Sequence, residues 1–264
     1  MTGPGADGVL LIHGAHHGAW LWDDMAPLLE LPYLAVSLPG RAGAAMPPAS
    51  LGSLTIGDLI ASAAADLDST GWDRAVIVGH SLGGAVAAGL AARAPEQTHH
   101  LLLIAANIPD PGGCALDSWP HGLRWLPRAA LALRPGGSQA PLTMSSRRAR
   151  NGLANDLDEA QARRLLGRLV PDTPGFLTSA MPDPAIPSGL PRSYLVTRRD
   201  RIHKPRRQVA AAAHLGAAII EIDSGHDPML AQPGALAAII NKIAASRAAP
   251  GTASMAAAQR TPKR

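Results

Sequence analysis

The stretch Gly79-His80-Ser81-Leu82-Gly83-Gly84 decides the fold of this 264-residue chain. It follows a short apolar run, Arg74–Val78, and leads into a segment with helical spacing, Leu82–Arg93. A serine on a sharp turn between a strand and a helix needs neighbours without side chains, because larger residues would clash there. In this setting the pattern predicts a nucleophile elbow, which presents a serine hydroxyl for covalent catalysis. A glycine-rich turn that only connects two elements is the plainer alternative.

Ser81 would need a base, because a serine hydroxyl is a weak nucleophile until a histidine, oriented by a carboxylate, takes its proton. Of the ten histidines, His226 lies in a loop, Ser224-Gly225-His226-Asp227-Pro228, between the last predicted strand and the last predicted helix. That position suits a base that follows the nucleophile and the acid in the chain. The other histidines considered lie at the start of a strand, in a helix or before a proline: His99, His100, His214 and His203.

Asp200 is the predicted acid, because it closes the segment Tyr194-Leu-Val-Thr-Arg-Arg-Asp200 at the carboxyl end of a predicted strand. Asp110 is the alternative, since it follows the preceding strand and a carboxylate there could also reach the histidine. Asp223 and Asp227 are too close to His226 in sequence to take this role easily.

Acyl transfer also requires hydrogen-bond donors for the oxyanion of the tetrahedral intermediate. One predicted donor is the backbone N–H of Leu82, directly after the nucleophile and at a helix N-terminus. The other is the N–H of Ala15, in the turn His13-Gly14-Ala15 after the first predicted strand. Both assignments depend on position, because backbone donors leave no side-chain signature.

Short apolar runs alternate with helical patterns along most of the chain, which predicts an α/β fold with a mostly parallel sheet flanked by helices. The predicted strands are Val9–Ile12, Tyr33–Leu38, Arg74–Val78, Leu101–Ala105, Tyr194–Thr197 and Ala218–Ile222. The predicted helices are Trp20–Glu30, Thr55–Leu67, Leu82–Arg93, Arg206–Leu215 and Ala235–Ala245, with Thr55 or Ser53 as a cap. The Gly/Ala/Pro-rich stretch up to about Ser53 is predicted to be flexible.

This alternation stops between about Pro111 and Pro191, where one helical pattern, Leu157–Val170, stands among many Pro, Gly and Arg residues. We therefore predict an α/β core at 1–110 and 191–246, with a helical cap inserted at 111–190. Residues 247–264 lack periodicity and are predicted to form a disordered basic tail.

The formal charge of +4 equals the contribution of the four basic residues in 247–264, so the remainder is near neutral and nucleic-acid binding is not expected. The single cysteine, Cys114, excludes an intramolecular disulfide and fits a cytosolic setting. No secretory signal and no spanning apolar run is apparent, which predicts a soluble protein. Neither His16-His17 nor His99-His100 has partners at metal-site spacing, and no phosphate-binding or dinucleotide glycine pattern appears, so no metal and no cofactor are expected.

Together these motifs resemble the α/β-hydrolase superfamily, over essentially the whole chain to about Ala245. The opening Leu11-Ile12-His13-Gly14-Ala15-His16-His17-Gly18-Ala19-Trp20-Leu21-Trp22 is similar to the plant-type methylesterase and hydroxynitrile-lyase branch. The lyases of that branch typically carry threonine at the position of Gly14 and lysine at that of Asp227, where an aspartate would repel a departing cyanide. Ser37 stands where many relatives have aspartate, a difference that concerns loop structure.

The resemblance implies a cofactor-independent serine hydrolase that cleaves a small-molecule carboxylic ester through an acyl-enzyme. The same triad serves thioesterases, lactonases, C–C lyases and cyclases in this superfamily, and a non-catalytic receptor is a further alternative. A homodimer is a possible assembly, although no sequence feature selects it.

The substrate is expected to lie between the cap and the first loop. Predicted contacts there are Gly14, His17, Trp20, Trp119, Leu123 and Trp125. The tryptophans and Leu123 would form an apolar wall for an aromatic or bulky group, or would simply pack the cap onto the sheet. His17 would orient the oxyanion loop or be a structural histidine. Arginines of the predicted cap would attract an anionic substrate or form a solvated basic face: Arg124, Arg128, Arg147 and Arg148.

Overall fold

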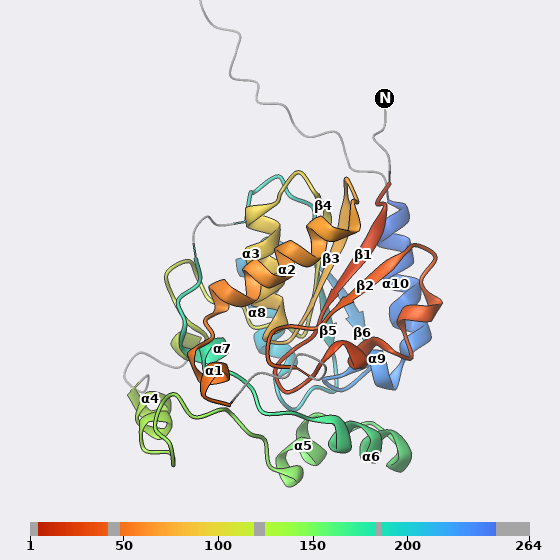
Figure 1. The fold of residues 1–264 in the computed structure, drawn as a ribbon. Coiled ribbons are helices and arrows are strands. Elements are labelled where there is room, and N and C mark those ends of the chain that lie inside the picture. Colours follow the sequence, from red (N-terminus) through yellow and green to blue (C-terminus); the bar gives the residue numbers. More distant parts are fainter. Residues whose placement is uncertain (1–4, 42–47, 119–124, 183–185, 247–264) are drawn as a thin grey trace, which may run out of the picture.

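A single six-stranded sheet forms the centre of the molecule, in a computed structural model that describes residues 5–41, 48–118, 125–182 and 186–246 (Figure 1). All five strand pairings are parallel, in the order β2-β1-β3-β4-β5-β6. The strands are β1 (Gly8–Ile12), β2 (Tyr33–Val36), β3 (Ala75–His80), β4 (Thr98–Ile104), β5 (Arg192–Thr197) and β6 (Ala218–Ile222). The predicted α/β class is confirmed.

Helices cover both faces of the sheet (Figure 1). On one face lie α2 (Ile56–Thr70), α3 (Gly83–Arg93) and α8 (Pro205–His214). On the other lie the 3-10 turns η1 (Ala19–Trp22) and η2 (Ala26–Leu28), with α9 (Pro228–Ala231) and α10 (Pro233–Ala245). None of the described helices has the length and apolar character needed to cross a membrane.

Strand β1 shows why the apolar runs are continuous rather than alternating. Leu10 and Ile12 pack with α2 and α3, whereas Val9 and Leu11 pack with α10 on the opposite face. All five residues of β1 are buried. A strand buried on both sides needs apolar residues at every position, which is typical of a central parallel strand.

The predicted helix over Trp20–Glu30 is wrong, because the structure has η1 and η2 there instead. The backbone bonds of this segment join residues three apart, as in Met25 N–H to Trp22 O at 3.0 Å. Pro27 explains the difference, since it lacks the N–H that an α-helix would direct to the carbonyl of residue 23. Two tryptophan side chains of η1 are buried nonetheless.

A short helix, α1 (Pro48–Ser53), stands in the stretch that was predicted to be flexible up to Ser53. Its first residue is proline, which is favourable at the first helical position because the missing N–H would have no intrahelical acceptor. The remainder of that stretch, 42–47, lies outside the described residues.

The predicted insertion holds more helix than the sequence pattern indicated. Its elements are η3 (Ala115–Ser118), α4 (Trp125–Ala132), α5 (Ser146–Gly152), α6 (Glu159–Arg168) and α7 (Gly175–Thr178). The described residues of 111–190 form no named strand, only isolated bridges such as Leu142 to Asp172. Figure 1 shows α5 and α6 beyond the sheet, at the end opposite the N-terminus. The cap function stays a prediction, as does the basic tail at 247–264, which lies outside the described residues.

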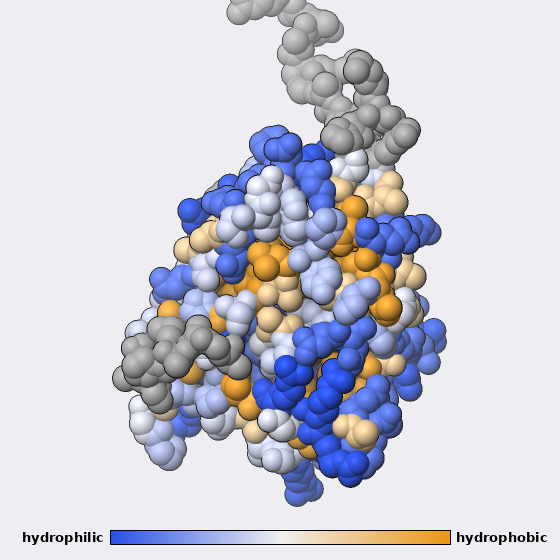
Figure 2. Space-filling view, turned by 45° about the vertical axis from the view of Figure 1, so that its right-hand side comes forward, coloured by the Kyte–Doolittle hydropathy of each residue, from blue (hydrophilic) through white to orange (hydrophobic). Residues whose placement is uncertain are grey.

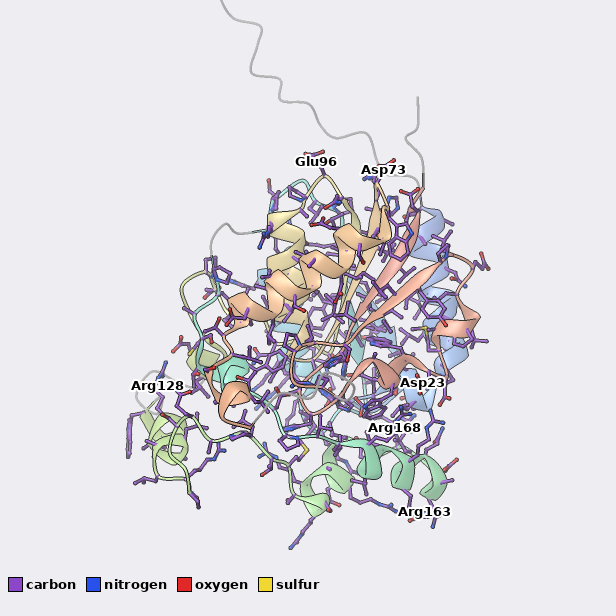
Figure 3. The ribbon with its side chains drawn as sticks, viewed as in Figure 1. Asp23, Asp73, Glu96, Arg128, Arg163 and Arg168 are labelled. Atoms are coloured by element: carbon purple, nitrogen blue, oxygen red, sulfur yellow. The ribbon has the colours of Figure 1, made fainter. Side chains whose placement is uncertain are left out.

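Ion pairs connect α6 to the segment around η1. Arg168 lies 2.9 Å from Asp23, and Arg164 lies 2.7 Å from Asp24 (Figure 3). These side chains are about half exposed, so each pair contributes little stability on its own. Hydrophilic side chains gather over this end of the molecule (Figure 2). These exposed ion pairs therefore contribute little to holding α6 against the first loop.

Helix α2 begins with a complete capping box, which yields a test of local stability. Thr55 Oγ1 accepts from the Asp58 N–H at 3.2 Å, and the Asp58 carboxylate accepts from the Thr55 N–H at 2.8 Å. We expect Thr55→Ala to lower the free energy of unfolding by about 1 kcal/mol, measured by urea denaturation. Ser62→Ala is the control in the same helix, because the Ser62 hydroxyl has no hydrogen-bond partner among the described residues. An equal loss in both variants would contradict the capping role.

Candidate active site

Ser81 lies between β3 and α3 with a backbone φ of 52°, a left-handed conformation that is unusual for a residue other than glycine. Its N–H donates to Ile104 O of β4 at 2.9 Å, which fixes the turn to the sheet. The flanking glycines are sterically required: a Cβ at Gly83 would lie 2.1 Å from His13 O, and one at Gly79 would lie 2.4 Å from Ala87 Cβ. The local geometry is that of the predicted elbow.

Three predicted side chains form one hydrogen-bonded chain. The Ser81 hydroxyl lies 3.0 Å from His226 Nε2, and His226 Nδ1 lies 2.7 Å from Asp200 Oδ2. His226 and Asp200 are buried. Nδ1 donates to the carboxylate, which leaves the Nε2 lone pair directed at the hydroxyl, the tautomer that a base requires.

The alternative acid, Asp110, is elsewhere. It is exposed, and its carboxylate lies 2.7 Å from Nε2 of His214 on α8. The structure thus places Asp200, and not Asp110, beside His226.

Asp200 is held by a hydrogen-bond network that the sequence did not indicate. Its Oδ1 accepts from the backbone N–H groups of Ile202 at 2.7 Å and His203 at 2.9 Å. Its Oδ2 also accepts from Thr197 Oγ1 at 3.1 Å and from Gln208 Nε2 at 3.0 Å. Gln208 is fully buried on α8, and its position in an amphipathic helix gave no signal of this contact. The network fixes the carboxylate orientation before substrate arrives.

The site electrostatics favour an ionised Asp200 next to His226. Burial opposes ionisation of Asp200, but the charge and hydrogen bond of His226, with the backbone N–H groups of His203 and Ile202, hold the carboxyl pKa below its usual range. Burial also opposes the charged ring of His226, yet the Asp200 carboxylate raises the pKa of His226 above 6.5, with a further contribution from Asp227. Asp200 and His226 therefore each favour the charged form of the other.

The backbone N–H groups of Ala15 and Leu82 have no acceptor among the described residues, whereas most neighbouring amides are bonded. Leu82 stands at the N-cap of α3, where the helix dipole favours negative charge. The unpaired pair of donors near Ser81 is what the predicted oxyanion site requires.

The loop carrying Ala15 is fixed by a buried ion pair that the sequence did not reveal. Asp172 accepts the His16 N–H at 2.6 Å and pairs with the guanidinium of Arg41, and both side chains are fully buried. His16 O in turn accepts the Val170 N–H at 3.0 Å, and His16 has a positive φ of 65°. The segment at 170–172 therefore holds the oxyanion loop from the side of the predicted cap.

Of the predicted substrate contacts, Gly14 lies against the nucleophile, since a Cβ at Gly14 would be 2.8 Å from Ser81 Cβ. His17 Nδ1 donates to Ala15 O at 2.7 Å, a contact within the loop that both an orienting and a structural histidine would make. Trp20 is buried, with its ring 5.5 Å from that of His17 and the Arg168 guanidinium 4.7 Å above it.

Among the described residues, the remaining predicted contacts do not form an apolar wall. Trp125 begins α4 and is 63% exposed, which argues against a buried wall at that position. Trp119 and Leu123 lie outside the described residues, as does Arg124. Arg128 pairs with Asp117 at 2.9 Å on the surface.

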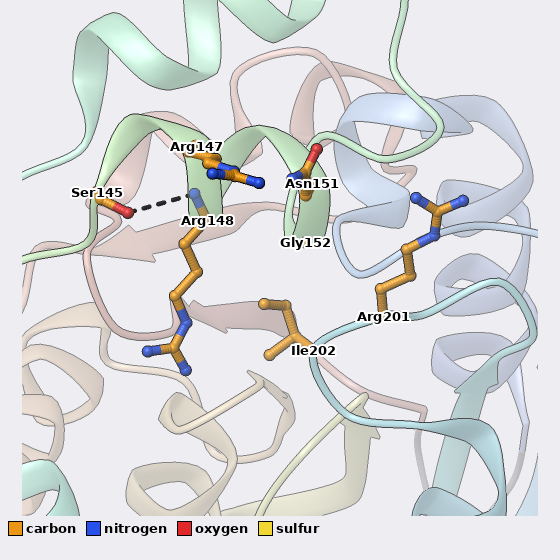
Figure 4. Close-up of a pocket in the computed structure, with 7 residues that line it drawn as sticks. All are labelled: Ser145, Arg147, Arg148, Asn151, Gly152, Arg201 and Ile202. Atoms are coloured by element: carbon orange, nitrogen blue, oxygen red, sulfur yellow. Dashed lines mark hydrogen bonds between the residues drawn. The ribbon is translucent and has the colours of Figure 1, made fainter.

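A pocket of about 420 Å³ lies between α5 and the loop after β5 (Figure 4). Its arginines are Arg147 and Arg148 of α5 and Arg201 beside the predicted acid. The other lining residues are Ser145, Asn151, Gly152 and Ile202. No triad residue lines it, so this recess is a basic surface feature separate from Ser81.

One described group of side chains has metal-ligand character: His80, His226 and Asp227 bring one ligand atom each within 4.8 Å of one another. Both ring nitrogens of His226 are already engaged, by Asp200 and by Ser81. A metal ion would have to break these hydrogen bonds, so the geometry favours the triad over a metal centre.

Comparison with known proteins agrees with this geometry. The family model described as the alpha/beta hydrolase family matches residues 9–239. A carbendazim hydrolyzing esterase from Nocardioides sp. is 29% identical over 115 residues, covering 43% of this chain and 48% of that protein. A pyrethroid hydrolase from Sphingobium wenxiniae is 31% identical over 106 residues, covering 39% and 37%. The chain thus matches less than half the length of these curated relatives.

Among solved structures, an extracellular α/β-hydrolase from a Paenibacillus species superposes with a TM-score of 0.74 at 20% identity. The match covers 89% of this chain and 98% of that one. That protein is described as sharing structural and functional homology with tobacco salicylic acid binding protein 2. At this identity the likeness is one of fold.

The contact of Gly14 with the elbow predicts a specific effect of adding one methyl group. We expect Gly14→Ala to slow the labelling of Ser81 by a fluorophosphonate at least about tenfold, because the new Cβ must displace the nucleophile or the oxyanion loop. The rate of adduct formation, followed by intact-protein mass spectrometry, measures this. Gly234→Ala in α10 is the control, since a Cβ there meets nothing within 4 Å; equal rates for wild type and Gly14→Ala would contradict the prediction.

Proposed function

Because this chain belongs to the alpha/beta hydrolase family, we propose that it hydrolyses carboxylic esters of small molecules through an acyl-enzyme formed on Ser81. The observation that carries the proposal is the continuous chain from Ser81 Oγ to His226 and Asp200, at 3.0 Å and 2.7 Å. Two relatives are named as an esterase and a pyrethroid hydrolase, which supports hydrolysis of a small molecule.

In the proposed acylation step, Ser81 Oγ attacks the ester carbonyl carbon while His226 Nε2 takes the hydroxyl proton. The carbonyl oxygen becomes an oxyanion that accepts hydrogen bonds from the N–H groups of Ala15 and Leu82. Asp200 stabilises the imidazolium that forms on His226. His226 then gives its proton to the alkoxy oxygen, the C–O bond breaks, and the alcohol leaves.

In the proposed deacylation step, His226 takes a proton from a water molecule, which attacks the acyl carbon of the ester on Ser81. The same two backbone donors stabilise the second oxyanion. Its collapse releases the carboxylic acid, and the proton returns from His226 to Ser81 Oγ.

Two details favour hydrolysis over the cyanohydrin cleavage found in the same branch. A threonine at Gly14 would place its Cβ 2.8 Å from Ser81 Cβ. Asp227 is fully buried, which by itself would raise its pKa. The neighbouring His17, His80 and His226 outweigh burial and lower the pKa to about 2. The side chain is therefore negative and would repel a cyanide leaving group. Reaction in heavy-oxygen water distinguishes hydrolysis from lyase or cyclase chemistry, since hydrolysis must place one solvent oxygen in the acid product.

The nucleophile assignment predicts that Ser81→Ala lowers kcat on a susceptible ester by roughly a thousandfold or more. Wild type should form a single fluorophosphonate adduct that peptide mapping places on Ser81. Ser193→Ala is the control, because Ser193 lies on β5 and its hydroxyl bonds His100 alone among the described residues. Wild-type turnover by the purified Ser81→Ala variant would overturn the proposal.

The pH dependence follows from the state of His226, which must be neutral to act as a base. Because Asp200 helps to raise the pKa of His226 above 6.5 despite burial, kcat/KM should fall as the pH drops through a midpoint above 6.5. Asp200→Asn removes that charge, so the acidic midpoint should move to lower pH while the rate at the optimum falls about 10⁴-fold. Stopped-flow or steady-state profiles measure both; an unchanged midpoint in Asp200→Asn would argue against Asp200 as the partner of His226.

A further inference from the structure

Asp227 is a fully buried carboxylate whose role the triad does not account for. Its Oδ2 lies 3.6 Å from His17 Nε2, and its Oδ1 lies 3.4 Å from His80 Nε2. Neither oxygen makes a full hydrogen bond with a described residue. An ionised carboxylate in such surroundings is costly unless nearby groups compensate its charge. We call Asp227, His17 and His80 the Asp227 cluster.

Each of the two histidines also bonds a main-chain carbonyl through a ring nitrogen. His80 Nε2 donates to His226 O at 3.0 Å, and burial lowers the pKa of His80 to about 3, so this ring is neutral with its proton directed toward His226 O and Asp227. His17 Nδ1 donates to Ala15 O, while its Nε2 faces the Asp227 carboxylate. Both ring nitrogens of His17 thus face oxygen atoms, one of Ala15 and one of Asp227.

The Asp227 cluster brings together three segments whose relative positions matter for the proposed reaction. His17 belongs to the loop that supplies the Ala15 N–H, and His80 is the residue before the nucleophile. Asp227 follows the base directly, and its main-chain carbonyl begins α9 through the Leu230 N–H at 3.0 Å. The cluster is therefore a direct link between the oxyanion loop and the base loop.

We propose that Asp227 is a positioning residue that, through His17, fixes the Ala15 oxyanion donor relative to His226. The inference rests on the proposed function. Loss of the link would leave the substrate-binding surface in place but let the Ala15 N–H drift from the developing oxyanion, which lowers kcat rather than raising KM.

Asp227 also contributes to the field at the base. The titratable groups facing His226 are Asp200 and His203 from the loop after β5, His80 from β3, and Asp227 from its own loop. Of these, the two carboxylates favour the imidazolium, against the effect of burial. Removing the charge of Asp227 should therefore move the acidic midpoint of kcat/KM to lower pH.

The experiment compares Asp227→Asn, which has nearly the same shape without the charge, with Asp223→Asn. Asp223 is the matched control because it lies four residues earlier, is 67% exposed and pairs with Arg199. Active sites are titrated with the fluorophosphonate, and kcat is expressed per titrated site, so that a loss of folded protein does not count. We expect a roughly ten- to hundredfold lower kcat per site for Asp227→Asn, a nearly constant KM, an acidic midpoint at lower pH, and no change for Asp223→Asn.

His17→Asn tests the same link from the other side. The asparagine amide can keep the donor to Ala15 O while removing the nitrogen that faces Asp227. We expect this variant to reproduce the loss in kcat per site, and the double variant to be no slower than either single one. Additive losses, or wild-type kcat per site in Asp227→Asn, would overturn the inference.

If Asp227→Asn does not fold, His17→Asn alone decides, and wild-type kcat per site there would overturn the inference. Failure of wild type to label at Ser81 or to turn over esters would instead overturn the proposed function, so the two outcomes are distinguishable.

Discussion

The left-handed backbone of Ser81 is the constraint on which the rest of the site depends. A non-glycine residue in this conformation costs about 1–3 kcal/mol and persists only when its surroundings impose it. Two contacts impose it here. The Ser81 N–H donates to Ile104 O on β4, and Gly83 lies close against His13 O at the end of β1. The turn is thus held by the two strands beside β3. The same arrangement brings the loop with Ala15 against the nucleophile, so the order of the central strands determines both the fold and the geometry of the site.

Three buried carboxylates surround this turn, and each is compensated in a different way. Asp200 accepts hydrogen bonds from the backbone and from Gln208, Asp172 pairs with Arg41, and Asp227 lies between two histidines. Each carboxylate fixes a segment that carries a reacting group or a donor. Removing one partner would leave an uncompensated charge in the interior, which is strongly destabilising. Rigidity of the site therefore depends on matched charges as well as on apolar packing.

The elements that sequence alone predicted are those set by local chemistry. The elbow, the order of Ser81, Asp200 and His226, the six strands and four of the five helices of the predicted core follow from motifs and periodicity within single segments, and the predicted family is confirmed. What was missed depends on contacts between distant segments or on one special residue. Pro27 converted a predicted helix into 3-10 turns, and Asp172 meets Arg41 across 131 positions of sequence.

Asp227 shows the same limit at the level of function. From sequence it was set aside as an acid because it is too close to His226, and it served only as a substitution that disfavours cyanide release. Nothing local indicates that His17 and His80 lie near it. In the folded chain the loop that carries Ala15 contacts three neighbours: the elbow, through Gly14; Asp172, from the predicted cap; and Asp227, which lies 3.6 Å from His17. In the proposed mechanism, a donor pair held in this way needs no reorganisation when the oxyanion forms, which is the property that gives such sites most of their rate enhancement.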